Sequence, residues 1–312
     1  MNVRIGLLLL PLLVPLLLLT VVLAWSQRSR RPLELDASRH AALLAAHRKA
    51  VAWRWAGLGL GVAAAPVTAV TASAGLHNLG AMLAPTVFGL CVIGGVVVGE
   101  LTTIPRRQGV RTAAIETRTV GHYLPRRLGG LVAVSALGLG SLLVTTTLMG
   151  SADAQGLAGR FLSRQCSSGA GSANGPWPGS FYSLPLGIAV VIGLLGAAVA
   201  LRIVVLRPRS GSDPEVVAVD DVLRRRSAEA VTAATGVLVA ASLSGVAFVA
   251  GIQLHRVSCP PASWAILGVA LLAVGALMLL FTSWCLALLL SGPRFTPVES
   301  EATAVAGQEV LR

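Results

Sequence analysis

Residues 189–201 read AVVIGLLGAAVAL, and residues 7–19 read LLLLPLLVPLLLL. Both runs are continuously apolar and lack the alternation at every second residue that is typical of strands in a membrane β-barrel. A helix rises about 1.5 Å per residue, so roughly 20 apolar residues cross a hydrocarbon core about 30 Å thick. Because lipid offers the backbone no hydrogen-bonding partner, stretches of this kind are predicted to be membrane-spanning helices.

Such stretches recur along the chain, which predicts an all-α polytopic membrane helix bundle. The composition agrees, because 54% of the 312 residues are hydrophobic and only 12% are charged, whereas soluble domains are about 25% charged. Residues 1–292 are expected to form one membrane domain, followed by a disordered cytoplasmic tail at 293–312. Seven transmembrane helices are predicted, at about 5–25, 55–75, 79–100, 130–150, 184–206, 229–252 and 264–290.

The first stretch could instead be a signal peptide, since Ala24 resembles the small residue that precedes a cleavage site. Its apolar run of about 20 residues is longer than the usual 7–15 of a signal sequence. Arg28, Arg30 and Arg31 follow it, as in a segment that stops transfer. These two features favour a retained helix.

The basic residues predict how the chain is oriented. One side of the predicted bundle holds only Arg4, Arg160, Arg164 and Arg256 in its loops and end. Because positively charged loops stay in the cytoplasm, the N-terminus is expected outside the plasma membrane and the C-terminus inside. The loops assigned to the inner side carry Arg28, Arg30, Arg31, Arg39, Arg48, Lys49 and Arg54, then Arg106, Arg107, Arg111, Arg118, Arg126 and Arg127, then Arg207, Arg209, Arg224, Arg225 and Arg226.

A formal net charge of +12 could also indicate a nucleic-acid partner. However, the arginines are divided among short loops beside span ends, and no basic stripe with interleaved aromatic residues is found. We therefore expect the bilayer and anionic lipid headgroups as partners, with other membrane or cytoplasmic subunits as further candidates and no nucleic acid. The tryptophans near span ends or in loops, which are typical of interface anchors, are Trp25, Trp53, Trp55, Trp177 and Trp264.

The loop at 101–128 contains a doubled motif, Ile104-Pro105-Arg106-Arg107 and Leu124-Pro125-Arg126-Arg127. Arginine binds phosphate through two parallel hydrogen bonds. Arg106, Arg107, Arg126 and Arg127 are therefore candidate contacts to lipid phosphates. The simpler interpretation is that both pairs only anchor the topology.

Two inner segments, 36–55 and 213–229, are predicted to be helical and to run into the spans that follow. Asp36 or Ser38 could cap the first, and the second has acids early and arginines late, as the helix dipole favours. Each either lies along the membrane face or continues its span as a protruding helix.

Topology separates the four cysteines, because Cys91 and Cys285 lie inside predicted spans. Cys166 lies in the long outer loop 151–183, and Cys259 lies in the outer loop 253–263. The two share the oxidising side of the membrane, so we predict a disulfide between them. The second half of the long loop is rich in Gly, Ser and Pro and is expected to be irregular.

Residues that could carry chemistry are scarce within the spans. Glu100, Arg202 and Glu229 lie near predicted inner ends rather than at mid-membrane. His40 and His47 are about 10.5 Å apart along a helix axis, which is too far for one zinc ion. The serines of spans four and six, Ser135, Ser141, Ser242 and Ser244, lack a histidine in the same layer and are expected to bond between helices. No catalytic, cofactor or metal site is therefore predicted, and the protein is not expected to be an enzyme.

Small residues spaced four apart predict helix packing. The Gly57–Gly61 run is interpreted in the same way rather than as a nucleotide-binding loop, because it follows no strand. Gly89 and Gly187 fall outside this spacing. The pairs are Gly95 with Gly99, Ala136 with Gly140, Gly196 with Ala200, Ala240 with Ser244, and Ala247 with Gly251.

Three short runs within residues 99–126 resemble a set of uncharacterised integral membrane proteins of actinobacteria. These runs are Gly99-Glu100-Leu101-Thr102, Arg111-Thr112-Ala113 and His122-Tyr123-Leu124-Pro125-Arg126. The resemblance implies a membrane location and carries no activity. The function expected is a non-enzymatic subunit or accessory component of a transport or envelope system. The alternatives are a stand-alone small-solute transporter or a receptor-like sensor.

Overall fold

The computed structural model describes residues 33–35, 41–72, 78–102, 125–153, 156–166, 171–207, 214–291 and 295–297. The predicted first span at 5–25 and the arginines Arg106 and Arg107 lie outside these residues, as does the predicted tail apart from its strand β4. The helices are α2 (Ala41–Thr71), α3 (Leu79–Thr102), α5 (Arg126–Met149), α6 (Ser180–Leu206), α7 (Pro214–Arg256) and α8 (Ala262–Leu290).

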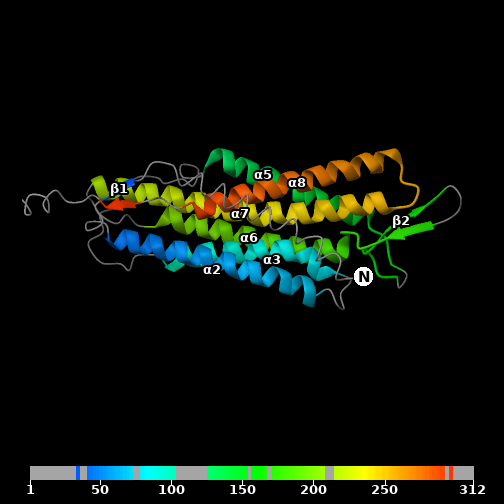
Figure 1. Cartoon of the computed structure of the whole chain (residues 1–312), viewed down its shortest axis with the longest axis horizontal. Coiled ribbons are helices and arrows are strands. Elements are labelled where there is room, and N and C mark those ends of the chain that lie inside the picture. Colours follow the sequence, from blue (N-terminus) through cyan, green and yellow to red (C-terminus); the bar gives the residue numbers. More distant parts are fainter. Residues whose placement is uncertain are drawn as a thin grey trace, which may run out of the picture.

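Two small sheets lie at opposite ends of an elongated bundle (Figure 1). β1 (Leu33–Leu35) pairs in parallel with β4 (Phe295–Pro297). At the other end, β2 (Leu162–Gln165) pairs antiparallel with β3 (Gly171–Asn174). The sequence predicted an irregular chain at 171–174. That prediction is wrong, because these residues form a four-residue antiparallel ladder with β2.

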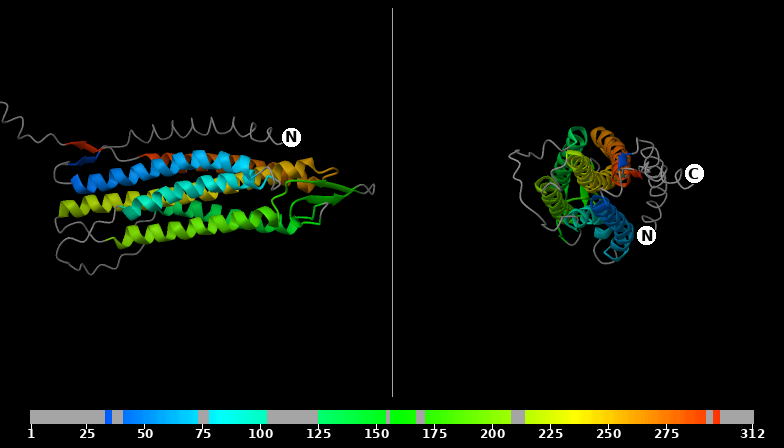
Figure 2. Two further views of the ribbon diagram at one scale, coloured as in Figure 1. Left: turned by 90° about the horizontal axis from the view of Figure 1, so that it is seen from below. Right: turned by 90° about the vertical axis from the view of Figure 1, so that its left-hand side faces the viewer.

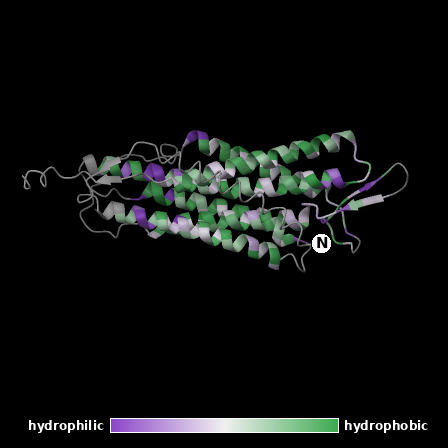
Figure 3. Cartoon of the chain, in the orientation of Figure 1, coloured by the Kyte–Doolittle hydropathy of each residue, from purple (hydrophilic) through white to green (hydrophobic). Residues whose placement is uncertain are grey.

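Six helices of the described chain are long and apolar enough to cross a membrane, as predicted for all spans after the first. The apolar residues occupy the middle of the bundle, and hydrophilic residues gather toward its ends (Figure 3). This distribution is the one that a bilayer requires, because charged groups are costly at the depth of the hydrocarbon core.

Helix α7 lies in the middle of the bundle, with α3, α5, α6 and α8 around it (Figure 2, right). In the 18-residue apolar window of each span, 78% of the residues of α7 are buried, compared with 17% of those of α8. Its inner positions are mostly small, and Ala233, Ala234, Ala240 and Ala247 are fully buried. Small side chains let the surrounding helices approach α7 closely, and fully buried larger residues such as Val231, Val237 and Leu238 pack between them.

Close helix contacts confirm part of the predicted small-residue packing. A Cβ atom on Gly95 would lie 2.5 Å from the carbonyl oxygen of Trp53, and one on Gly57 would lie 2.7 Å from that of Cys91. The prediction is wrong for Gly140 and Gly196, where an added Cβ atom would meet no neighbouring atom within 4 Å. Gly89, outside the spacing pattern, packs directly against the backbone of Leu238 in α7. Spacing alone cannot show which face of a uniformly apolar helix turns inward.

The two inner segments are continuous with their spans. α2 is already helical at Ala41, and α7 is a single helix of 43 residues, about 65 Å long. This length is about twice the hydrocarbon thickness, so α7 is much longer than one membrane crossing requires. For residues 41–55 and 214–229 the structure therefore favours the protruding helix over a separate surface helix. Asp36 and Ser38 lie outside the described residues.

Candidate functional site: buried ion pairs at the basic end

Charged side chains gather where α2 and α7 begin and where α3 and α6 end. These four ends meet because sequential helices of the bundle run antiparallel (Figure 1). We call this the basic end, since the exposed cations Arg48, Lys49, Arg225 and Arg226 also lie there. The described cations of the opposite end are Arg160, Arg164 and Arg256.

The first buried ion pair joins α2 to α3. Arg54 donates from its terminal nitrogen to Glu100 Oε1 at 3.4 Å, and the two side chains are 7% and 4% exposed. The Nε of Arg54 is buried without a hydrogen-bond partner among the described residues. Glu100 was predicted at the end of span three, and it lies two residues before the end of α3; that this end is the cytoplasmic one stays a prediction. Its partner was not predicted, because 46 residues separate the pair in sequence.

The second ion-pair group joins the end of α6 to α7 and centres on the fully buried Asp220. Arg224 donates to Asp220 Oδ2 from Nε at 2.9 Å and from a terminal nitrogen at 2.7 Å. Arg207 donates to Asp220 Oδ1 at 3.3 Å. Arg224 also donates to the carbonyl oxygen of Arg207 at 2.7 Å, which satisfies a backbone acceptor just after α6. One carboxylate therefore holds two guanidinium groups from two helices.

A cavity of about 20 Å³ lies between these two groups of ion pairs. Such a volume holds about one water molecule, whereas small-molecule sites usually span about 300–1,000 Å³. The walls come from all four helices, so a water there would bridge α2 and α3 to α6 and α7. The lining residues are Ala46, His47, Ala50, Glu100, Arg207, Leu223 and Ser227. This arrangement is suited to joining helices rather than to enclosing an organic solute.

Sequence reasoning missed Arg54, Asp220 and Arg224 as partners. Asp220 and Arg224 are four residues apart on one helix, a spacing that brings side chains together and could have indicated the pair. No comparable signal marks Arg54, since its inward orientation depends on how α2 is rotated against α3.

Polar side chains within the membrane-spanning part bond to neighbouring helices, as predicted for some of the serines. Ser242 and Thr86 lie 2.9 Å apart through their hydroxyl oxygens and join α7 to α3. Ser244 donates to the carbonyl oxygen of Gly275 in α8 at 2.8 Å. Ser135 contacts Met278 Sδ at 3.7 Å. For Ser141 the prediction is wrong, because its hydroxyl bonds to Gly138 of its own helix.

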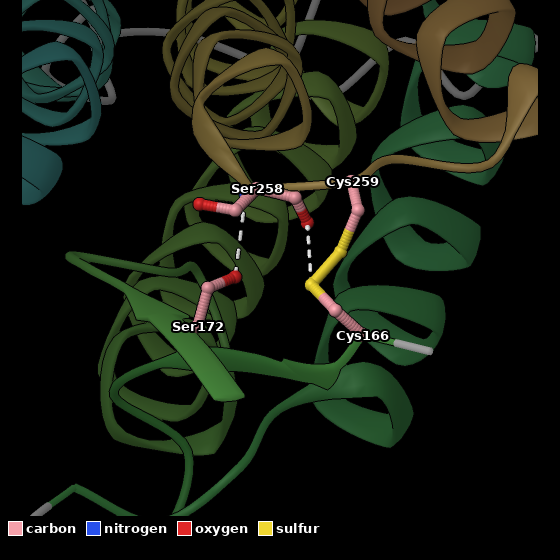
Figure 4. Close-up of a disulfide and its surroundings, with 4 residues drawn as sticks. All are labelled: Cys166, Ser172, Ser258 and Cys259. Atoms are coloured by element: carbon pink, nitrogen blue, oxygen red, sulfur yellow. Dashed lines mark hydrogen bonds between the residues drawn. A yellow bond between two sulfur atoms is a disulfide. The ribbon is translucent and has the colours of Figure 1, made fainter. Parts of the chain in front are cut away.

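The opposite end carries the cysteine pair. Cys166 and Cys259 form a disulfide with their Cα atoms 6.2 Å apart, as predicted. It joins the end of β2 to the turn between α7 and α8 (Figure 4). Beside it, the backbone N–H of Ser258 donates to Ser172 Oγ at 3.3 Å, and the Asn174 side chain donates to the carbonyl oxygen of Arg256. We call the β2–β3 hairpin with this turn the cap.

Apolar packing also holds the cap to the bundle. Trp177 is 1% exposed and donates from Nε1 to the carbonyl oxygen of Thr146 at 2.8 Å. It packs in a buried cluster with Leu162, Leu254 and Val257. Its predicted role as an interface anchor is therefore wrong, because the hairpin folds back over it. Trp53 and Trp55 of α2 are exposed, as interface anchors would be.

Of the four arginines predicted to contact lipid phosphates, two lie within the described residues. Arg126 and Arg127 are exposed in the first turn of α5, at the basic end. This position is accessible to headgroups, so their role stays a prediction.

No known protein family, curated protein or solved structure matches this chain.

Proposed function

We propose that the chain is an integral protein of the bacterial plasma membrane with seven spans, its basic end in the cytoplasm and its cap outside. Two independent features support this orientation. Arginine-rich loops remain in the cytoplasm, and disulfides form on the oxidising side of the membrane. The cations gather at one end of the described bundle, and the Cys166–Cys259 disulfide lies at the other.

We further propose that it acts as a non-enzymatic subunit or accessory component of a transport or envelope system. The observation that carries this proposal is the burial of α7 at the centre of the bundle. α7 occupies the axis with fully buried alanine, valine and leucine side chains. The buried charges of the basic end are engaged in ion pairs, of which Arg54–Glu100 and Arg207–Asp220 join different helices and Arg224–Asp220 lies within α7. Such a bundle is suited to presenting two rigid ends, one on each side of the membrane, to other proteins.

A small-solute transporter is the second candidate. Pro66 and Pro85 lie inside α2 and α3, and an internal proline removes a backbone hydrogen bond and can kink its helix, as in the broken helices of transporters. Thr86 and Ser242 place two buried neutral hydroxyl groups between α3 and α7, and these would contact a solute only if the two helices separated. A receptor-like sensor has weaker support, since a count of helices is only an analogy.

Purification of the tagged full-length chain in a mild detergent tests the first candidate. A subunit should retain one or more proteins in stoichiometric amount, and these should be lost in a harsh detergent that leaves the chain folded. Reconstitution of the chain alone into proteoliposomes tests the second. Concentrative flux of a solute by the isolated chain, together with no retained protein, would refute the subunit proposal in favour of transport.

A further inference from the structure

From its start, the exposed surface of α2 carries first cations, then tryptophans, then aliphatic side chains. A phospholipid has the same order of groups, from its charged headgroup through the interface to its acyl chains. Arg48 and Lys49 are exposed near its start. Trp53 and Trp55 follow, 38% and 50% exposed. Beyond them the exposed surface is aliphatic and includes Leu60, Val62, Val67 and Val70. This order matches a headgroup, an interface and acyl chains.

Helical spacing places each cation on the same side of α2 as a tryptophan. Arg48 and Trp55 are seven residues apart, or about 10.5 Å along the axis, and Lys49 and Trp53 are four apart, or about 6 Å. Indole rings are favoured at the level of lipid headgroups. Long cationic side chains can extend from there toward phosphate while their methylene groups cover apolar surface.

The charge on this helix is separated into an inward and an outward part. The inward cation, Arg54, is 6% exposed and is paired with Glu100 of α3. The outward cations are Arg48 and Lys49, and α2 contains no Asp or Glu along Ala41–Thr71. Its outer surface is therefore purely cationic at the basic end, which is complementary to an anionic headgroup and not to a zwitterionic one.

We propose that the outer face of α2, formed by Arg48, Lys49, Trp53 and Trp55, binds an anionic phospholipid of the inner leaflet. The assignment to that leaflet depends on the orientation proposed above. Binding to an anionic headgroup does not depend on it and can be measured in symmetric vesicles. Each basic residue near an anionic surface strengthens binding by about fivefold, so Arg48 and Lys49 together should favour an anionic over a zwitterionic lipid by roughly thirtyfold.

Lys49 is the chain's single lysine and so provides a direct readout. The full-length protein is reconstituted into vesicles of phosphatidylcholine alone and into vesicles of phosphatidylcholine with phosphatidylglycerol, neither of which carries a primary amine. Acetylation of Lys49 by an amine-reactive ester is then followed by peptide mass spectrometry. We expect phosphatidylglycerol to slow the reaction at Lys49 about fivefold or more. Equal rates in the two lipids would overturn the proposal.

Retention of lipid by charge variants is the second measurement. Arg48→Gln with Lys49→Gln should weaken binding of phosphatidylglycerol about thirtyfold in detergent titrations read by native mass spectrometry. The matched control is Arg225→Gln with Arg226→Gln, two exposed cations at the same end on α7, which should bind as the wild type does. If both double variants lose lipid equally, the attraction comes from the general charge of the basic end and the α2 site is refuted. Both variants change exposed residues, so misfolding is not expected, and the elution volume in size-exclusion chromatography checks this.

Discussion

Replacing Asp220 by asparagine should separate the charge at the basic end from the packing around it. The side chain is fully buried and holds Arg224 at 2.7 and 2.9 Å and Arg207 at 3.3 Å. Asparagine has almost the same shape and keeps one carbonyl acceptor. The substitution removes the negative charge that Arg224 and Arg207 share. Their side chains are only 2% and 12% exposed, so both cations would lose this counterion while remaining largely buried.

The magnitude follows from that burial. Removing one partner of a buried ion pair costs about 3–5 kcal/mol, because the remaining charge stays desolvated. For a chain of this size, such a loss lowers the unfolding midpoint by roughly 10 °C. The matched control is Glu229→Gln on the same helix. Its partner Arg226 lies at 2.8 Å, but the side chains are 28% and 43% exposed, and exposed pairs contribute only about 0–1 kcal/mol.

Thermal unfolding of both variants and the wild type in the same detergent provides the assay, with loss of the monodisperse size-exclusion peak as the signal. Asp220→Asn should melt far below Glu229→Gln. The double variant Asp220→Asn with Arg224→Gln should lose much less than the sum of its single variants, since the two residues act as a unit. If Asp220→Asn melts within about 2 °C of Glu229→Gln, the ion pairs do not hold α6 to α7 and the reasoning fails.

Three further predictions concern the glycine contacts, the disulfide and the topology. Gly95→Val should destabilise the protein by about 1–3 kcal/mol through overpacking against α2. Gly94→Val should be neutral, because a Cβ atom there would meet no atom within 4 Å. Equal melting temperatures of the two variants would contradict the close α2–α3 contact. Peptide mapping without reductant should recover Cys166 linked to Cys259, and detection of both as free thiols would disprove the bridge. Cys166→Ser with Cys259→Ser should cost less than the roughly 4.6 kcal/mol expected for an unrestrained loop of similar length, since apolar packing also holds the cap. The topology can be tested in a background with Cys91 and Cys285 replaced by serine. A membrane-impermeant thiol reagent should then label Leu157→Cys in intact cells and Arg225→Cys only after permeabilisation. The reverse pattern would refute the proposed orientation.

The spans and the charge separation between the two ends could be read from the amino acids because both are local, additive properties. Transfer of about 20 residues into lipid depends on their summed hydropathy and not on their neighbours. The pairing of Cys166 with Cys259 could be predicted for a related reason, since the spans leave these two cysteines together on one side. The hairpin at 171–174 could not, because its Gly- and Ser-rich strand becomes regular only through pairing with β2.

The arrangement of the helices around α7 could be decided only by the tertiary structure. Every span is apolar on all sides, and lipid is as apolar as leucine, so no hydrophobic preference marks the inward face. The inward face is set by shape, through contacts such as Gly89 against Leu238 and Gly57 against Gly95. The same rotations turn Arg54 toward Glu100 and leave Arg48 and Lys49 outside. The amino acids therefore determine which segments are long and apolar enough to cross a membrane, whereas close packing determines which of the few charges meet.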